Sequence, residues 1–334
     1  MVAIGNGAVQ GLVVYPIKSC GGVSVRRALV TRTGLRLDRE WMLVDATSRR
    51  FLSQRSHPGM ATIRVDLPEP AFTLDGDLEG FMHVSCPGAS DALRVPLTAP
   101  PLATALENAP QASVWEWTGR VHDEGEDAAR WFSEALGTSC RLVRMPPCDR
   151  ALGIRATDAA FPPVAASAFS DGFPFLLTHT ASLEALNSAM AGDGVVAMNR
   201  FRPNVVVAGD GWAPWDEDTW DAVSLENARG DGAIRLSLVK PCSRCKVTTV
   251  DQTTGEVAAD GGTLPKGEPL RALSRMHSGA AASFAEAKWA RVPFFGWNAV
   301  VDDSGGAAEH GRFVSVGDTV RITPRAAPGP GRAA

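Results

Sequence analysis

Short strand-like segments separated by turns dominate the first third of the chain, and they limit the folds that it can adopt. β-Branched and other apolar residues gather in segments of a few residues, and turns follow about every 8 to 12 residues. The predicted strands cover residues 9–17, 23–25, 28–31, 40–45, 50–54 and 61–67. Strands this short and this closely spaced are typical of an antiparallel or barrel-like module.

Two helices stand out further along the chain. Apolar residues recur at helical spacing over residues 124–136, and Gly137 follows as a stop signal. A second helix is predicted over residues 180–190, where Leu183 and Leu186 lie on one face. The strand pattern then resumes over residues 204–207, 222–225, 233–239, 246–250 and 314–322. The sequence therefore predicts a mixed α/β fold.

A segment rich in proline and alanine separates two parts of the chain. Residues 144–166 have weak periodicity, and we place the domain boundary within them. The prediction is an N-terminal module at residues 8–145 and a second domain at residues 146–325. Proline, glycine and alanine dominate residues 326–334, which predicts a disordered tail.

The composition is that of an ordinary globular protein. Of the 334 residues, 45% are hydrophobic and 21% are charged, so a sizeable core can form. The net charge of −4 gives no reason to expect nucleic acid as a partner. Six cysteines are too few for a disulfide scaffold in a chain of this length, which favours a reducing compartment. Without an apolar run near the ~20 residues of a membrane span, and without a signal peptide, we expect a cytoplasmic protein.

The segment with the most reactive chemistry joins two cysteines to two cations. Cys242 and Cys245 form a CxxC pair at the end of an apolar run, and Arg244 and Lys246 flank the second cysteine. Nearby positive charge favours the thiolate, which acts as a nucleophile or as a soft metal ligand. Structural zinc needs more ligands than this pair supplies. The strand predicted over residues 246–250 argues against a thioredoxin-like pair, which should open a helix. A single functional thiol and an inert buried pair both remain open.

Further cations lie at three separate places beside predicted strands. Lys18 and Ser19 lead into a glycine turn, Arg39 lies between acidic residues, and Arg200 and Arg202 precede a buried strand. Backbone N–H groups, a hydroxyl and an ammonium group together make a small anion site, and arginine binds phosphate in a bidentate manner. Taken separately, Lys18 is better explained as a solvated lysine of a hairpin, Arg39 is explained by a surface salt bridge, and the last two arginines are compatible with a charged loop. The six histidines lack metal-binding spacing, and no Rossmann, P-loop or α/β-hydrolase motif occurs.

Taken in order, these segments resemble the MOSC superfamily, and specifically the amidoxime-reducing components. The resemblance rests on eight collinear matches that cover nearly the whole chain: YPIKSCGGV, GLRLDREWMLVD, FLSQRSHPGMATI, FSDGFPFLL, THTASLEALNS, NRFRPNVVV, KPCSRCKVTTVDQTTGE, and FGWNAVV followed by VSVGDTVRI. It implies a MOSC N-terminal module of short strands and helices, followed by a β-barrel-like MOSC domain. The cofactor of the family would lie between the two.

That cofactor is a molybdenum cofactor (Mo-molybdopterin), in which a protein cysteine is a ligand of the metal. On this sequence the resemblance makes Cys245 both the metal ligand and the catalytic residue, and thiolate is a donor suited to such a centre. The implied cofactor-binding residues are Lys18, Ser19, Arg39, Asp171, Gly172, Phe173, Arg202, Ser243 and Arg244. Relatives carry small hydroxyl residues where this chain has Gly172 and Phe173, so the resemblance does not extend to side-chain contacts there. One anionic cofactor would explain the dispersed cations together.

The implied activity is the two-electron reduction of N-hydroxylated compounds such as amidoximes and hydroxylamines, with nitrite reduction to nitric oxide as a further reaction. In relatives the electrons come from a cytochrome b5 type or ferredoxin-like carrier served by an NAD(P)H-dependent reductase. Nothing rich in cysteine follows Cys245, so we expect a separate carrier protein; pyridoxal phosphate is not expected. One alternative is a non-catalytic molybdenum-cofactor carrier or sulfur-relay protein, against which the lack of a fused sulfurase domain argues. The other is a metal-free binding protein with a structural cysteine pair.

Overall fold

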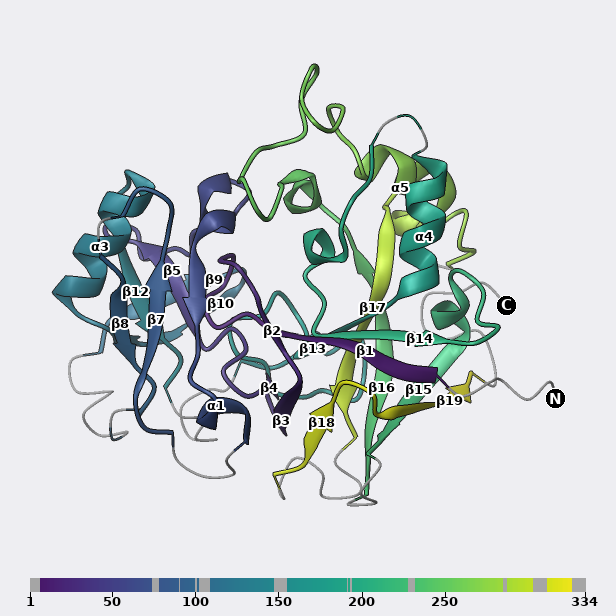
Figure 1. The fold of residues 1–334 in the computed structure, drawn as a ribbon, viewed down its shortest axis with the longest axis horizontal. Helices are drawn as coiled ribbons and strands as arrows, with labels where there is room; N and C mark the ends of the chain where they lie inside the picture. Colours follow the sequence, from purple (N-terminus) through teal and green to yellow (C-terminus); the bar gives the residue numbers. More distant parts are fainter. Residues whose placement is uncertain are drawn as a thin grey trace.

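The chain folds into a mostly β protein with few helices (Figure 1). The computed structural model describes residues 7–73, 78–89, 91–99, 101, 109–146, 155–190, 192, 194–227, 232–284, 287–302 and 311–325. Figure 1 shows two lobes, a smaller one drawn mainly in purple and blue and a larger one drawn mainly in green and yellow. The predicted tail at residues 326–334 lies outside the described residues.

In the described chain, seven strands of the larger lobe close into a barrel. Their order is β14–β13–β17–β16–β15–β19–β1, and β1 pairs with β14 to complete the ring. The strands are β1 (Gly7–Val14), β13 (Phe175–His179), β14 (Val205–Gly209), β15 (Trp220–Glu226), β16 (Ala233–Ser243), β17 (Phe294–Val301) and β19 (Thr319–Pro324). Only β13 and β14 run parallel, and helix α4 (Thr180–Ala189) lies between them in the chain. Gly296 lets β17 approach β13, because its φ is 72° and a Cβ there would lie 2.5 Å from the Leu177 carbonyl oxygen.

The first strand of the chain belongs to the barrel and not to the smaller lobe. β1 pairs with β14 along one edge, and with β19 and β2 (Val23–Val25) along the other. Residues 8–14 therefore lie in the barrel, although the predicted N-terminal module begins at residue 8. In the opposite sense, β18 (Phe313–Ser315) returns from the far end of the chain to pair with β3 (Arg27–Thr31). The chain thus crosses between the lobes more than once, and the limits set at residues 145 and 146 stay a prediction.

Small sheets and helix α3 (Glu126–Leu136) build the smaller lobe (Figure 1). The remaining strands are β4 (Gly34–Leu35), β5 (Trp41–Asp45), β6 (Arg64–Asp66), β7 (Phe81–Ser85), β8 (Leu93–Pro96), β9 (Gln111–Val114), β10 (Trp117–Arg120), β11 (His122–Asp123) and β12 (Cys140–Arg144). Shorter helices are α1 (Pro70–Thr73), α5 (Leu270–Met276), η1 (Pro58–Thr62), η3 (Met198–Phe201), η4 (Asp216–Thr219) and η6 (Ala287–Trp289). Buried side chains of both lobes, among them Trp41, Phe132 and Trp297, form one continuous core. This shared core holds the two lobes in a fixed relation.

Both predicted helices are confirmed, with their ends shifted by two residues or fewer. α3 ends at Gly137, whose φ of 63° is the left-handed conformation that glycine adopts at low cost. The strand predicted over residues 314–322 is instead divided into β18 and β19, with Gly317 at a φ of 96° between them. Residues 50–54, predicted as a strand, form only isolated bridges.

The strand predicted over residues 246–250 is wrong. Residues Lys246–Thr249 form a 3₁₀ helix, η5, directly after Cys245. Two threonine hydroxyls stabilise this turn: Thr248 Oγ1 donates to the Cys245 carbonyl at 3.0 Å and Thr249 Oγ1 to the Lys246 carbonyl at 2.7 Å. Such local side-chain bonds compete with strand pairing despite the β-branched composition. Because a short helix and not a strand follows Cys245, the local structure does not exclude a thioredoxin-like pair.

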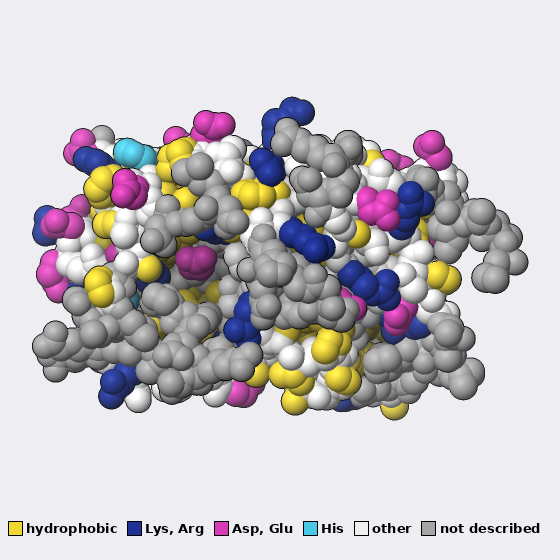
Figure 2. Space-filling model, turned by 90° about the horizontal axis from the view of Figure 1, so that it is seen from below, with side chains coloured by type: hydrophobic (Ala, Val, Ile, Leu, Met, Phe, Trp, Pro, Cys, Tyr) yellow, Lys and Arg dark blue, Asp and Glu magenta, His cyan; other side chains and the backbone are white. Residues whose placement is uncertain are grey.

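The surface has mixed charge. Among the residues coloured in Figure 2, basic and acidic side chains are interspersed over the face shown. In the described part of the chain, every helix is too short or too polar to cross a membrane.

Candidate functional site

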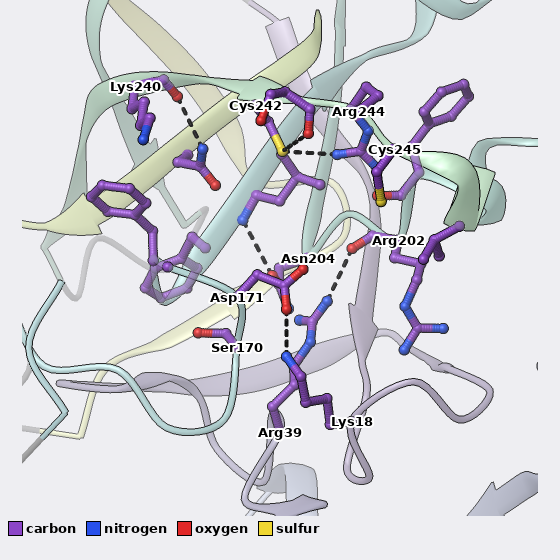
Figure 3. A pocket seen from close by; sticks show the side chains of 18 of the residues that line it. Lys18, Arg39, Ser170, Asp171, Arg202, Asn204, Lys240, Cys242, Arg244 and Cys245 are labelled. Carbon is purple, nitrogen blue, oxygen red and sulfur yellow. Dashed lines mark hydrogen bonds and ion pairs between the residues drawn. The ribbon is translucent and has the colours of Figure 1, made fainter. Parts of the chain in front are cut away.

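A cavity of about 430 Å³ lies where the barrel meets the smaller lobe, and Figure 3 shows its lining. Strand ends and loops from both lobes form its wall. All ten residues predicted from the family resemblance line it: Lys18, Ser19, Arg39, Asp171, Gly172, Phe173, Arg202, Ser243, Arg244 and Cys245. The structure thus brings together segments from opposite ends of the chain. This placement is compatible with one shared ligand, and the individual roles stay predictions.

The end of β16 and the start of η5 position Cys245. The pairing of β16 with β17 shifts register between Pro241 and Ser243, and β16 ends at Ser243, which lines the cavity. Cys245 follows in extended conformation and caps η5. Its side chain is partly exposed to the cavity, and neither Cys242 nor Cys245 is in a disulfide. The thiol therefore lies two residues beyond the end of β16 and, because it is not in a disulfide, can bind a ligand.

Each cysteine of the pair has its own arginine (Figure 3 labels the cysteines and Arg244). Arg244, expected beside Cys245, instead donates from Nη1 to Cys242 Sγ at 2.8 Å. Cys245 Sγ accepts from Arg55 Nη2 at 3.2 Å, and Arg55 comes from the smaller lobe. The described residues contain no cluster of three or more His, Cys, Asp or Glu side chains that could hold a metal. A structural zinc site therefore has no ligand set among them.

Lys18 is a buried cation paired with Asp171. Its Nζ donates to the Phe169 carbonyl at 2.8 Å and forms an ion pair with the Asp171 carboxylate. Burial lowers the pKa of Lys18 to about 8, although Asp171 opposes the shift. Burial also acts to raise the pKa of Asp171, but the charges of Lys18 and Arg55 outweigh it and hold that pKa below its usual range. At neutral pH both groups are charged.

Tyr15 carries two arginines over its ring. The guanidinium carbons of Arg39 and Arg202 lie 4.2 Å and 4.3 Å from the ring centroid, a favourable cation–π geometry. Arg39 also donates to Asp38 Oδ2 at 2.5 Å and to the Arg202 carbonyl at 3.1 Å. Burial lowers the pKa of Arg202 to about 10, so it stays charged at neutral pH.

Strained backbone concentrates around the cavity. Eight described residues other than glycine have a positive φ, and four of these line the cavity: Ser19, Arg39, Trp115 and Arg202. Each such residue costs of order 1–3 kcal/mol and persists only where the surrounding structure fixes it. Such strain clusters at functional sites, which supports this cavity as the site of activity.

Among the residues that the structure describes, three buried polar atoms beside the cavity have no hydrogen-bond partner. They are Arg202 Nη2, Arg244 Nε and the Tyr15 hydroxyl. An unpaired buried donor costs about 1–3 kcal/mol, so a ligand that supplied acceptor atoms would be stabilised. Together with the cations, these donors suit an anionic, oxygen-rich ligand.

Residues behind the cavity wall, which the sequence analysis did not identify, hold the lining residues in place through hydrogen bonds. Gln54 and Gln252 exchange hydrogen bonds at 3.0 Å and 2.9 Å, one from each lobe. Gln54 also donates to the Ser19 carbonyl at 2.7 Å, and Gln252 Oε1 accepts from Arg202 Nη1 at 3.1 Å. Arg155, which is buried, donates to the Ser170 and Asp171 carbonyls. The Gln54–Gln252 pair thus connects the cavity segment at Ser19 with the one at Arg202.

Other residues that the sequence did not single out lie in the cavity wall itself, among them Arg55, Trp115, Glu116, Asn204 and Lys240. Gln54 and Arg55 fall within the FLSQRSHPGMATI segment, and Gln252 within KPCSRCKVTTVDQTTGE, so the family resemblance had marked their neighbourhoods. Trp115 lies in none of the matched segments, and only the fold places it at the site.

Comparison with known proteins identifies the family. Residues 6–139 match the MOSC N-terminal beta barrel domain, and residues 165–321 match the MOSC domain. The chain is 33% identical over 321 residues to mitochondrial amidoxime-reducing component 1 of Mus musculus, covering 95% of this chain and 82% of that protein. Its identity to the Homo sapiens protein of the same name is 32%, covering 95% and 83%. Molybdenum cofactor sulfurase of Oryza sativa subsp. japonica is 28% identical, covering 81% of this chain and 31% of that protein. This chain therefore belongs to the MOSC-domain family of the amidoxime-reducing components.

Proposed function

We propose that this protein is a molybdenum-cofactor-dependent reductase of N-hydroxylated compounds, namely amidoximes and hydroxylamines. The observation that carries the proposal is a free thiol, Cys245, at the wall of a cavity that six cations line: Lys18, Arg39, Arg55, Arg202, Lys240 and Arg244. The names of the relatives, amidoxime-reducing component and molybdenum cofactor sulfurase, support a cofactor of this class.

The residues present fit such a cofactor. The unpaired donors Arg202 Nη2 and Arg244 Nε need acceptor atoms, which phosphate and pterin groups provide. In this proposal Lys18, Ser19, Arg39 and Arg202 hold the phosphate and pterin. Ser243 and Arg244 would lie beside the metal ligand, and the backbone of residues 171–173, which also lines the cavity, would make a further contact with the cofactor. The thiolate of Cys245 completes a set of soft sulfur donors.

When bound, the cofactor would supply the two-electron redox chemistry, and the protein would supply binding, orientation and charge. Reduction of an N–OH group consumes two electrons and two protons and releases water, so the site has to deliver protons as well as electrons. Lys18 Nζ holds a proton at neutral pH, because its pKa is about 8, and Asp171 orients it. Arg55 fixes the Cys245 sulfur through its hydrogen bond at 3.2 Å.

The electrons would come from a separate carrier of the cytochrome b5 or ferredoxin-like class, reduced by an NAD(P)H-dependent enzyme. Lys246, which follows Cys245, is exposed and adds positive charge beside the site. An acidic carrier would be attracted to positive charge at the edge of the cavity, so the turnover rate should fall as the salt concentration rises. Salt-independent turnover would contradict this docking mode.

A second candidate is a carrier or sulfur-relay protein that binds the molybdenum cofactor without reducing a substrate. The match to molybdenum cofactor sulfurase over 81% of this chain favours it. The two candidates differ in one measurable property, because only a reductase turns over an N-hydroxylated substrate.

The test is reduction of benzamidoxime by molybdenum-loaded protein with a reconstituted electron chain. Cys245→Ala should abolish turnover, because the Cys245 thiolate is the proposed metal ligand. Cys242→Ala should keep a substantial fraction of the turnover. Lys18→Ala and Arg202→Ala should lower the molybdenum content per chain, measured by elemental analysis. Equal loss of activity in both cysteine variants, or full molybdenum retention in both cation variants, would refute these roles. Molybdenum binding without any turnover would favour the carrier.

A further inference from the structure

The turn between β9 and β10 places a strained tryptophan at the cavity wall. Val114 pairs with Trp117, so the hairpin loop consists of Trp115 and Glu116, and both residues line the cavity. Trp115 has a φ of 53°. Two-residue hairpin loops with a positive φ normally use glycine, asparagine or aspartate, and a bulky residue in this conformation is a true outlier. A glycine would form the same turn without strain, so the turn itself does not explain the tryptophan.

The Trp115 ring is held in a fixed orientation. It contacts the Phe51 ring, with 5.0 Å between centroids, and the Arg55 guanidinium lies 4.7 Å from its centroid. Its Nε1 donates to Asp171 Oδ1 at 3.2 Å. Even so, 37% of the residue remains exposed. A rigid aromatic side chain that keeps accessible area costs little conformational entropy when it binds a ligand.

The contacts of this ring connect it to the proposed reaction centre. Arg55, which lies over the ring, donates to Cys245 Sγ, and Asp171, which accepts from the ring nitrogen, pairs with Lys18. The smaller lobe therefore brings an aromatic surface to the cavity that holds the proposed metal ligand. An aryl group stacked on this surface would lie in the same cavity as Cys245.

We propose that Trp115 is the specificity-determining residue for planar aryl substrates, such as aryl amidoximes, and acts as the surface on which the aryl group stacks. This inference rests on the proposed function and adds the chemical class that the site prefers. Offset stacking on one aromatic ring contributes a factor of about three to ten in affinity beyond the buried area. Small N-hydroxylated compounds without a ring would gain nothing from Trp115.

The experiment compares benzamidoxime with hydroxylamine, using molybdenum-loaded wild type, Trp115→Ala and Trp115→Phe. Trp115→Ala should lower kcat/KM for benzamidoxime about three- to tenfold more than it lowers kcat/KM for hydroxylamine, and mainly through KM. Trp115→Phe, which keeps a ring, should retain most of the benzamidoxime activity. The matched control is Phe81→Ala in β7, because Phe81 is also 37% exposed and has Arg94 over its ring at 4.1 Å, but does not line the cavity. Phe81→Ala should leave kcat/KM unchanged for both substrates.

A second readout does not depend on turnover. Titration of benzamidine, an aryl amidine, into each variant by calorimetry should give a Kd about three- to tenfold higher for Trp115→Ala than for wild type. Equal losses for both substrates in Trp115→Ala, or an unchanged benzamidine Kd, would overturn the inference and leave Trp115 a structural residue of the turn. If loaded wild type reduced neither substrate, the proposed function would fail, and the benzamidine comparison would still decide whether Trp115 binds aryl groups.

Discussion

Replacing Lys18 with methionine should stabilise the cofactor-free protein while weakening cofactor binding. The lysine side chain is 6% exposed, and burial moves its pKa from 10.5 to about 8. A shift of this size corresponds to about 3 kcal/mol of destabilisation at pH 7, at 1.36 kcal/mol per pKa unit. Methionine removes that penalty but leaves the Phe169 carbonyl without its donor, which costs about 1 kcal/mol. The expected net gain in the free energy of unfolding is therefore about 2 kcal/mol.

The gain should depend on pH in one direction. The folded pKa of Lys18 is lowered, so the unfolded chain binds the proton more tightly and the penalty is complete below about pH 8. It then decreases as the pH rises from 8 through 10.5, above which the lysine is neutral in both states. Urea unfolding of cofactor-free wild type and Lys18→Met should show the 2 kcal/mol difference at pH 7 and almost none at pH 10, with unchanged m-values.

A control variant and a second measurement test this prediction further. Lys240→Met removes another cavity lysine, but its side chain is 26% exposed and pairs with Asp158 at 3.1 Å, so the free energy of unfolding should change by no more than about 1 kcal/mol. After loading, Lys18→Met should contain less molybdenum per chain than wild type, although its cofactor-free form has the higher free energy of unfolding. A less stable Lys18→Met protein at pH 7, or a difference that persists at pH 10, would refute the reasoning.

Two further substitutions test the groups that support the site. Gln252→Ala removes the bonds that it exchanges with Gln54 and the one that it accepts from Arg202; we expect a loss of about 2–4 kcal/mol in urea unfolding, because buried donors are left unpaired. A loss below about 0.5 kcal/mol would show that the lobes do not depend on this pair. Thr248→Val removes the hydroxyl bond to the Cys245 carbonyl and should cost about 1 kcal/mol, measured in the same way; an increase in stability would mean that β-branched packing, and not this bond, sets the turn.

Some features followed directly from the order of residues. The apolar periodicity of α3, with Gly137 after it, predicts a helix because local spacing and a local stop signal define it. The collinear motifs identified the family, and they named ten residues that the fold does bring to one cavity. Such features depend on short-range patterns or on motifs that a chain carries in its sequence.

Other features depend on contacts between distant segments, which no local pattern encodes. The β-branched run after Cys245 predicts a strand, but threonine hydroxyls bonded to carbonyls turn it into a 3₁₀ helix. Arg244 is the nearest arginine in sequence to Cys245, yet it donates to Cys242, and the guanidinium on Cys245 comes from Arg55 in the other lobe.

The chain thus determined by itself its two longest described helices, about half of its described strands and the residue types of its site. Only the tertiary structure decided that β1 closes the barrel, which charges meet which sulfur, and that Trp115 lines the cavity. The physical reason is that burial, hydrogen bonding and charge pairing act through space, between residues that the sequence places far apart.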